Sequence, residues 1–400
     1  MTNMPESDSV VRVKLIDTTT AMVGTAESFV QPVVPGHEII NFCSLAFLLE
    51  NETLGKKAIF DLGVRKDYWN LPRAVQKGVL GPESVIFGIR VDKGIDEVLK
   101  DGGVGPESID FCIWSHAHFD HRGDVSVFPK STTLVAGPGY FSSKGRPGGP
   151  DDPQAASEFE GRVLREADFG GGLMVGKFKA EDFFGDGSLY LLEAPGHQPE
   201  HICALARTKP SSSSGGATFV FLGGDICHFA GVFRPTKDTP LPEAIPGSAI
   251  ARRWDWSSKA ACPCSYFTPH HPNAEDGKSA RTTPWYQLPR GGKHPVYTNF
   301  DLATDSVSKM RELDVKDNIM VCIAHDASLL DVLPVFNKQP NEDINEWKSE
   351  GWKSTTYWSW LNEVSVEGEA PRPPIVEGFW RDGKKWDYAA YLKSLGRAHI

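Results

Sequence analysis

The sequence has no long uninterrupted apolar segment. Its longest apolar run, residues 39–49, contains Asn41 and Ser44 and is shorter than the roughly 20 residues of a membrane-spanning helix. We interpret this run as a β-strand and expect no membrane partner. The first seventeen residues mix acidic and basic side chains and lack the apolar core of a signal peptide, which predicts a cytoplasmic location.

Positive charge is also scarce. The chain has 42 Lys and Arg residues against 52 Asp and Glu residues, so its net charge is −10 with neutral histidines. A chain of this charge has no overall field that attracts a phosphate backbone or an anionic lipid surface. We therefore predict that it does not bind nucleic acid.

The cysteines predict neither disulfide bonds nor a cysteine-based zinc site. They number seven, which is odd, and Cys112 and Cys322 lie within apolar runs, where cysteine packs as a small hydrophobic residue. The pair Cys262 and Cys264 has no second pair at the spacing of a zinc site. These features are typical of a protein in a reducing compartment.

The composition favours a folded chain with a large core. Of the 400 residues, 40% are hydrophobic and 24% are charged, and the length allows one or two domains. Short β-branched or aromatic runs dominate, while residues 93–100 and 301–313 carry apolar side chains at helical spacing. Because strands and helices do not alternate strictly, we predict an α/β fold with a mostly antiparallel, layered core.

Two regions depart from this pattern. Residues 233–295 are rich in Pro, Trp, Lys and Arg and are too long for an ordinary loop, so we expect an insertion that closes as a lid, with a packed surface excursion as the alternative. Its candidate contact residues are Trp254, Trp256, Phe267, Trp285 and Tyr286. The tail, residues 341–400, contains six of the 11 tryptophans. Since each tryptophan buries on the order of 200 Å² when packed, we expect the tail to pack on the core.

The most informative segment places four potential metal ligands within six residues, directly after a strand-like run. In an extended segment, His116 and His118 point to the same side, so both imidazoles can reach one metal ion. A bend then allows Asp120 and His121 to face a second ion. A histidine pair alone is more often a satisfied polar group, but three further candidates follow: His197, Asp225 and His325, each at the end of a strand-like run.

Together these motifs resemble a known family. HAHFDH at 116–121, APGH at 194–197, GGD at 223–225 and IAHD at 323–326 are similar to the signature motifs of the metallo-β-lactamase superfamily, and FDLG at 60–63 is similar to its preceding acidic motif. The resemblance implies an αββα sandwich of two mixed, mostly antiparallel sheets flanked by helices. This catalytic domain would span residues 10–340, and residues 341–400 would form the extension.

The resemblance also implies roles for single residues. His116, His118 and His197 would bind the first metal ion, Asp120, His121 and His325 the second, and Asp225 would bridge both. The ligand set suits two divalent ions, with Zn²⁺ expected first and Fe, Mn or Co as alternatives. Asp61 would hold a ligand imidazole from behind, or merely cap a turn. His201 would pack behind the ligand loop, with a ligand role as the alternative.

The expected chemistry is hydrolysis. Two divalent cations that share one water lower its pKa from about 15.7 toward about 7, which provides a bridging hydroxide for attack on a carbonyl. Asp120 would accept and return its proton. The form of the motifs is most similar to the N-acyl-homoserine-lactonase-like branch and to enlarged fungal members, which implies that a cyclic ester or cyclic amide is opened.

His228 marks a departure from this branch. Lactonases carry a Tyr three residues after the bridging aspartate, where this chain has His228. We expect His228 to donate a hydrogen bond to the substrate, with a core position beside Phe229 as the alternative.

Other functions stay open at this point. A thioesterase of the glyoxalase-II type would bind its substrate through late basic residues, for which Lys384, Lys385 and Arg397 are a weak match. A non-catalytic metal-binding scaffold is the alternative from another class. The sequence also leaves open a homodimer.

Overall fold

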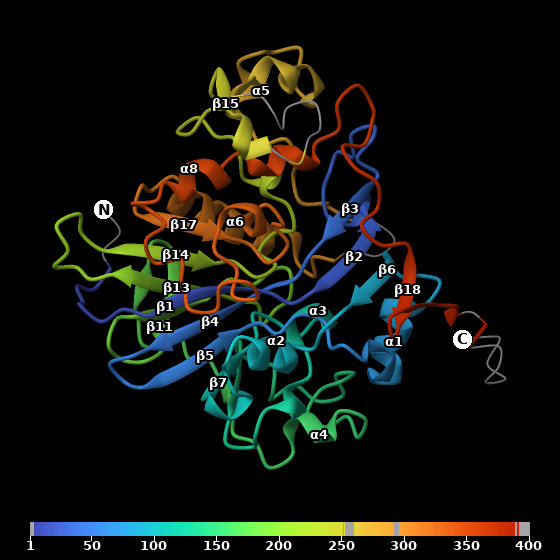
Figure 1. The fold of residues 1–400 in the computed structure, drawn as a ribbon, viewed down its shortest axis with the longest axis vertical. Helices are drawn as coiled ribbons and strands as arrows, with labels where there is room; N and C mark the ends of the chain where they lie inside the picture. The colour runs from blue at the N-terminus through green and yellow to red at the C-terminus, as the bar shows by residue number, and fades with distance from the viewer. Residues whose placement is uncertain (1–3, 251, 253–259, 292–295, 389, 392–400) are drawn as a thin grey trace.

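Two six-stranded mixed sheets form the centre of the molecule (Figure 1). The computed structural model describes residues 4–250, 252, 260–291, 296–388, 390 and 391. The first sheet has the order β1 (Arg12–Asp17), β4 (Leu45–Asn51), β5 (Lys56–Phe60), β7 (Phe111–Ile113), β8 (Thr133–Ala136) and β9 (Leu164–Glu166). The second has the order β10 (Met174–Val175), β11 (Phe178–Asp182), β12 (Leu189–Glu193), β13 (Ile202–Lys209), β14 (Thr218–Leu222) and β17 (Ile319–Cys322).

Alternating side chains hold the sheets together face to face. On β4, Leu45, Phe47 and Leu49 point into the core between the sheets, whereas Ala46 and Leu48 point to the outer face. That outer face packs on α2 (Ile95–Asp101), and the outer face of the second sheet packs on α6 (Phe300–Asp314). The predicted αββα fold class and both predicted helices are therefore confirmed. In the first sheet, however, β5, β7, β8 and β9 pair in parallel.

A third sheet of five strands was not predicted. Its order is β19 (Lys384–Trp386), β18 (Gly378–Arg381), β6 (Ile86–Val91), β2 (Thr20–Thr25) and β3 (Ile39–Phe42). β18 pairs with β6 in parallel, beside α1 (Arg73–Leu80), as Figure 1 shows in red and blue. The C-terminal extension thus supplies two strands to a sheet whose other strands lie in the first 91 residues.

The prediction of a single strand over 39–49 is wrong. The run forms β3 and β4, which belong to different sheets, and the chain bends at Cys43 and Ser44. The backbone oxygens at the bend have specific donors: Cys43 O accepts from His325 Nδ1 at 2.6 Å, and Ser44 O accepts from Thr18 Oγ1 at 2.6 Å. Alternate residues of β3 and nearly all residues of β4 are buried, so apolar side chains continue on both sides of the bend and do not reveal it.

The remaining elements lie around this core. They are β15 (Ala244–Pro246), β16 (Ala261–Pro263), α3 (Phe119–Arg122), α4 (Ala156–Phe159), α5 (Ser279–Thr282), α7 (Leu329–Val332) and α8 (Trp352–Thr356). In the extension, Trp347 and Trp360 are almost fully buried. Within the described residues, every helix is too short or too polar to cross a membrane.

Candidate metal centre

Polar residues follow five strands of the two central sheets and meet at one edge. Asp61 follows β5, His116 follows β7, His197 follows β12, Asp225 follows β14 and His325 follows β17. The turn before Asp225 needs glycine, because Gly224 has a φ of +50° and a Cβ there would lie 2.6 Å from the Ser115 Cβ. The strand ends therefore place the predicted ligands on one side of the core.

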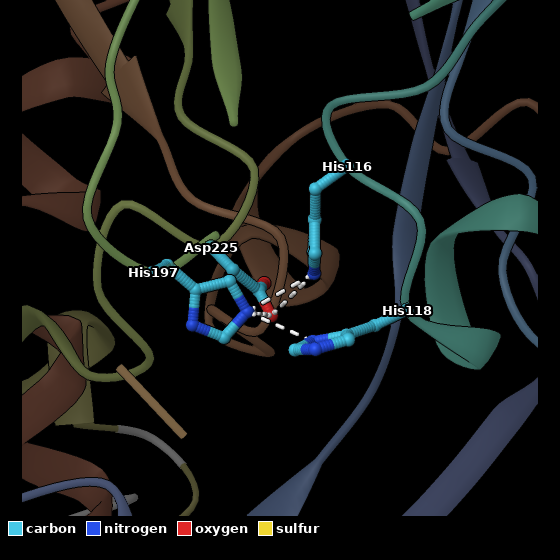
Figure 2. Close-up of side chains that lie close together, drawn as sticks. All are labelled: His116, His118, His197 and Asp225. Carbon is cyan, nitrogen blue, oxygen red and sulfur yellow. Dashed lines mark hydrogen bonds and ion pairs between the residues drawn. The ribbon is translucent and has the colours of Figure 1, made fainter. Parts of the chain in front are cut away.

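The first cluster contains His116, His118, His197 and Asp225 (Figure 2). His197 Nε2 lies 3.0 Å from His116 Nε2 and 2.9 Å from His118 Nδ1. Asp225 Oδ2 lies 3.4 Å from His197 Nε2 and 3.6 Å from His116 Nε2. Three imidazole nitrogens and one carboxylate oxygen thus converge on one point.

The second cluster contains Asp120, His121, Asp225 and His325. Here the other carboxylate oxygen, Asp225 Oδ1, lies 3.1 Å from His121 Nε2 and 3.0 Å from His325 Nε2. Asp120 Oδ2 lies 3.6 Å from both of these ring nitrogens. Asp225 therefore faces each cluster with a different oxygen, which is the geometry of a bridging ligand.

The donor set fits two divalent cations. His121 Nε2 and Asp225 Oδ1 are buried without a hydrogen-bond partner among the described residues, which is costly unless another group satisfies them. Both atoms face the second cluster. Imidazoles and carboxylates are ligands that suit zinc, and each cluster supplies four of them, with Asp225 shared.

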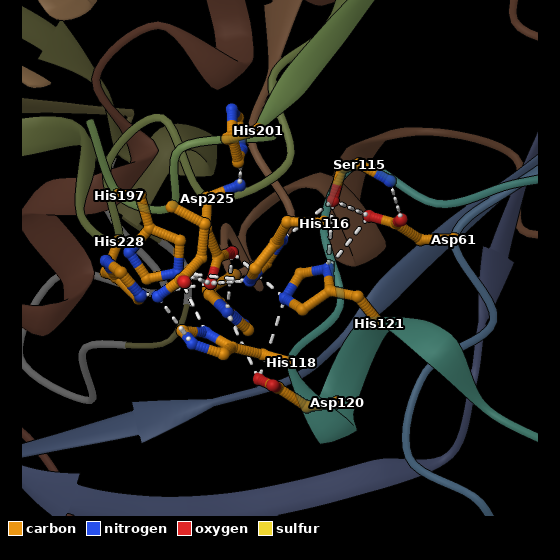
Figure 3. Close-up of polar contacts among 12 residues, drawn as sticks. Asp61, Ser115, His116, His118, Asp120, His121, His197, His201, Asp225 and His228 are labelled. Carbon is orange, nitrogen blue, oxygen red and sulfur yellow. Dashed lines mark hydrogen bonds and ion pairs between the residues drawn. The ribbon is translucent and has the colours of Figure 1, made fainter. Parts of the chain in front are cut away.

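Residues behind the ligands fix the imidazoles (Figure 3). His121 Nδ1 donates to Asp61 Oδ2 at 2.8 Å, and Asp61 also accepts from the Ser115 amide and hydroxyl. Because the Ser115 hydroxyl donates to Asp61, its oxygen is free to accept from His116 Nδ1 at 3.1 Å. In this arrangement the Nε2 atoms of His116 and His121 point into the two ligand clusters.

The electrostatics differ between the two clusters. Burial and neighbouring imidazoles lower the pKa of His116 and His197 well below its usual range, which keeps both neutral. Burial also opposes the charge of His121, but the nearby carboxylates of Asp225, Asp120 and Asp61 outweigh it and raise the His121 pKa. The second cluster is thus strongly attractive to positive charge.

His201 lies behind Asp225 and has both ring nitrogens engaged. Its Nδ1 donates to Ala194 O at 3.0 Å, and its Nε2 accepts from the Asp225 amide at 3.0 Å. Burial lowers the pKa of His201 to about 3, so the ring is neutral. His201 therefore holds the backbone of the bridging residue and offers no lone pair to a metal ion.

His228 lies at the same site. Its Nε2 is 3.0 Å from Asp225 Oδ2, and its Nδ1 is 2.8 Å from the hydroxyl of Tyr297. A carboxylate only accepts, so His228 Nε2 donates to Asp225 and Nδ1 accepts from Tyr297. The His228 ring stacks on that of His325 with an interplanar angle of 10°.

A cavity of about 460 Å³ opens over the two clusters. Its polar side, which we call the cavity floor, contains His118, Asp120, His197, Asp225, His228 and His325. Its apolar side, which we call the cavity wall, contains Met22, Phe29, Phe42, Val75, Val79 and Ile86. Arg146 and the buried Glu200 also line it and form an ion pair, in which Arg146 Nη2 lies 3.1 Å from Glu200 Oε2.

Comparison with known proteins agrees with this geometry. The family model described as Metallo-beta-lactamase superfamily matches residues 44–223. Gamma-lactamase FDB1 of Fusarium pseudograminearum is 39% identical over 90% of this chain and 84% of its own length. The chain belongs to the metallo-β-lactamase superfamily. It is a hydrolase of this fold with two candidate His/Asp metal sites.

Two further proteins are similar to this chain. Metallo-hydrolase mfmC of Annulohypoxylon moriforme is 38% identical over 90% of this chain and 89% of its own length. A solved N-acyl homoserine lactone hydrolase has a TM-score of 0.49 and 16% identity, and the match covers 82% of this chain and 98% of that one.

The described part of the insertion does not line the cavity, and its closure as a lid stays a prediction. This part comprises residues 233–250, 252 and 260–291. Val296, which directly follows the insertion, does line the cavity. Phe267, Trp285 and Tyr286 are instead buried in the core, with Trp285 6.0 Å from Trp360 between ring centroids. Trp254 and Trp256 lie outside the described residues.

Several residues of the metal centre and its cavity were not predicted from the sequence. Ser115 directly precedes the first motif and Gln198 directly follows the second, so their positions alone could have pointed to them. Tyr297 and Arg146 are close to no motif, because only the fold brings Tyr297 to His228 and Arg146 to the cavity. Glu200 lies three residues after the second motif. Lys384 and Lys385 lie on β19 and do not line it, and Arg397 is outside the described residues.

Proposed function

We propose that this hydrolase opens a cyclic ester or a cyclic amide and uses two divalent metal ions, with Zn²⁺ expected first. One observation carries the proposal: Asp225 presents a different oxygen to each of two histidine clusters at the floor of an apolar cavity. When bound, two such ions supply an activated water and polarise the carbonyl under attack.

Asp120 is the residue we assign to proton transfer. Its carboxylate lines the cavity and lies 3.6 Å from His121 Nε2 and His325 Nε2, so it faces the second cluster and the substrate space at once. A carboxylate at this position can hold the proton of the attacking water and return it to the departing ring atom.

The cavity supports a small cyclic substrate with an apolar body. Its volume of about 460 Å³ lies within the usual range for small-molecule sites, and aliphatic and aromatic side chains form the wall. Arg146 is neutralised by Glu200, so the lining does not offer a free cation to a strongly anionic substrate. The gamma-lactamase relative supports the inclusion of cyclic amides.

His228 is our candidate for a hydrogen-bond donor to the substrate. It lines the cavity, and the Tyr297 hydroxyl leaves the hydrogen of His228 on Nε2, next to Asp225 Oδ2. A substrate oxygen that binds near Asp225 would meet the same hydrogen. The stacking on His325 keeps the ring in place.

A glyoxalase-II-type thioesterase is less well supported. Such an enzyme needs cationic residues for an anionic substrate, and among the described lining residues Arg146 is the one Lys or Arg. A non-catalytic scaffold is disfavoured because the floor is open to a cavity rather than sealed in the core.

The test is a panel of lactones, lactams and thioesters with purified protein of measured metal content. We expect turnover of at least one lactone or lactam with about two metal ions per chain. Preferential turnover of thioesters would favour the glyoxalase-II-type alternative. A metal-loaded protein inactive on the whole panel, including a chromogenic lactone, would favour the scaffold.

A further inference from the structure

Each imidazole that binds a metal ion through one nitrogen carries a hydrogen on the other, which needs an acceptor. Three of the five candidate histidines have an evident one. His116 donates to Ser115 Oγ, His121 to Asp61 Oδ2 and His325 to the backbone oxygen of Cys43. His118 differs, because it faces the cluster with Nδ1 and leaves Nε2 pointing outward.

The partner of this outer nitrogen is Gln198. His118 Nε2 and Gln198 Nε2 lie 2.9 Å apart. If His118 binds a cation through Nδ1, both of these nitrogens carry hydrogens, and two donors cannot form a hydrogen bond. The two ends of a glutamine amide have the same shape and are assigned from the hydrogen-bond network. The metal-binding form of His118 therefore requires Gln198 to present Oε1 at this position.

The backbone holds Gln198 in a fixed place. Its carbonyl oxygen accepts from the amide of Gly196 at 3.1 Å and from the amide of His201 at 3.2 Å. The side chain thus starts from a closed turn between His197 and His201. His118 is half-buried whereas the other four histidines are buried, so packing alone restrains its ring less.

We propose that Gln198 is a positioning residue for the first metal ion: its Oε1 accepts from His118 Nε2 and thereby keeps Nδ1 directed at the cluster. This inference rests on the proposed dinuclear function. It assigns a role to the residue directly after His197, which the motif itself does not explain.

The experiment measures zinc affinity by competition with a chromogenic chelator, and also the visible spectrum of the cobalt-substituted protein. Gln198→Leu removes the acceptor and is expected to weaken the affinity of the more affected site by about 10- to 100-fold. Gln198→Glu supplies a carboxylate acceptor and should restore the affinity. Gln339→Leu, at an exposed position, is the matched control and should behave like the wild type.

The outcomes separate this proposal from the proposed function. Wild-type zinc affinity and an unchanged cobalt spectrum in Gln198→Leu would overturn the role of Gln198. A Glu variant as weak as the Leu variant would do the same, because it would show that the acceptor is irrelevant. If Gln198→Leu fails to fold by circular dichroism, Gln198→Asn, whose amide is one methylene shorter, replaces it with the same expectation. A wild-type chain that binds no zinc would instead refute the proposed function.

Discussion

The side chains of the cavity floor lie beyond the ends of strands in the two central sheets. The cavity wall comes from the third sheet, from α1 and from the loop between β2 and β3, which contains Phe29. The floor residues lie in short motifs in which the residue type already indicates the chemistry. The wall residues are ordinary apolar side chains. Chemistry can therefore be inferred from the sequence, but the shape of the substrate space cannot.

The wall also depends on distant parts of the chain. β6, which carries Ile86, pairs with β18 of the C-terminal extension. The hydroxyl of Tyr68 accepts from the Trp380 amide at 2.9 Å, and the Trp69 ring lies 6.3 Å from that of Trp386. The extension thus supports the wall, while floor residues have hydrogen-bond partners in loops, such as Cys43 for His325 and Tyr297 for His228.

The largest effect on turnover is expected at Asp225, which belongs to both ligand clusters. Asp225→Ala removes the shared ligand and should lower the metal content below two ions per chain. Metal ions contribute several kcal/mol to transition-state stabilisation, which corresponds to a loss of turnover of about 10³-fold or more. Metal analysis and turnover on the best substrate check this, and two tightly bound ions in the variant would contradict the bridging role.

Asp120→Ala separates proton transfer from metal binding. With both metal ions restored, turnover should still fall by about 10²- to 10⁴-fold, the usual contribution of a general acid or base. The measurement is the turnover number at saturating zinc, with metal content determined in the same sample. Full turnover at full metal content would show that Asp120 is only a ligand.

His228→Phe tests the donor at the edge of the floor. Loss of a preorganised donor costs about 10²- to 10³-fold in turnover, and the loss should be greater for amides than for esters, because the departing amine needs a proton. Kinetics on a matched lactone and lactam provide the comparison. Equal turnover in variant and wild type would place His228 among the residues that merely pack.

A substitution in the cavity wall should change substrate binding and leave the metal content unchanged. Val79→Ala on α1 removes apolar contact with the substrate, and at about 1–3 kcal/mol per methylene in a hydrophobic pocket we expect KM to rise by about 10-fold or more. Metal content should remain at two ions per chain. The same substitution at the exposed Val163 is the control. A loss of metal from Val79→Ala would show that wall and floor are not separable.

The parts of the molecule that could be predicted from the sequence are those that short, local motifs or helical spacings encode. The seven proposed ligands come together in the structure, and α2 and α6 lie where their apolar spacing indicated. The third sheet was missed because the pairing of β6 with β18 joins segments that are far apart in the chain. The acceptor for His325 was missed because it is the backbone oxygen of Cys43, which no side-chain pattern reveals.

The smallest effect on turnover is expected at His37, which is buried where the loop between β2 and β3 meets the insertion. Its Nδ1 lies 2.6 Å from the Tyr286 hydroxyl, and burial lowers the pKa of His37 from 6.5 to about 4. The unfolded chain therefore binds more protons between these values. Stability should fall as the pH drops through this window, by about 2 kcal/mol between pH 7 and pH 5.

His37→Gln removes this titration and can retain a hydrogen bond to Tyr286. We expect the free energy of unfolding in urea to fall less from pH 7 to pH 5 in the variant than in the wild type, at equal metal loading. Turnover at pH 7 should stay close to that of the wild type, since His37 does not line the cavity. An identical pH dependence in both proteins would mean that His37 remains accessible to protons. The acid sensitivity would then have to come from the histidines of the floor.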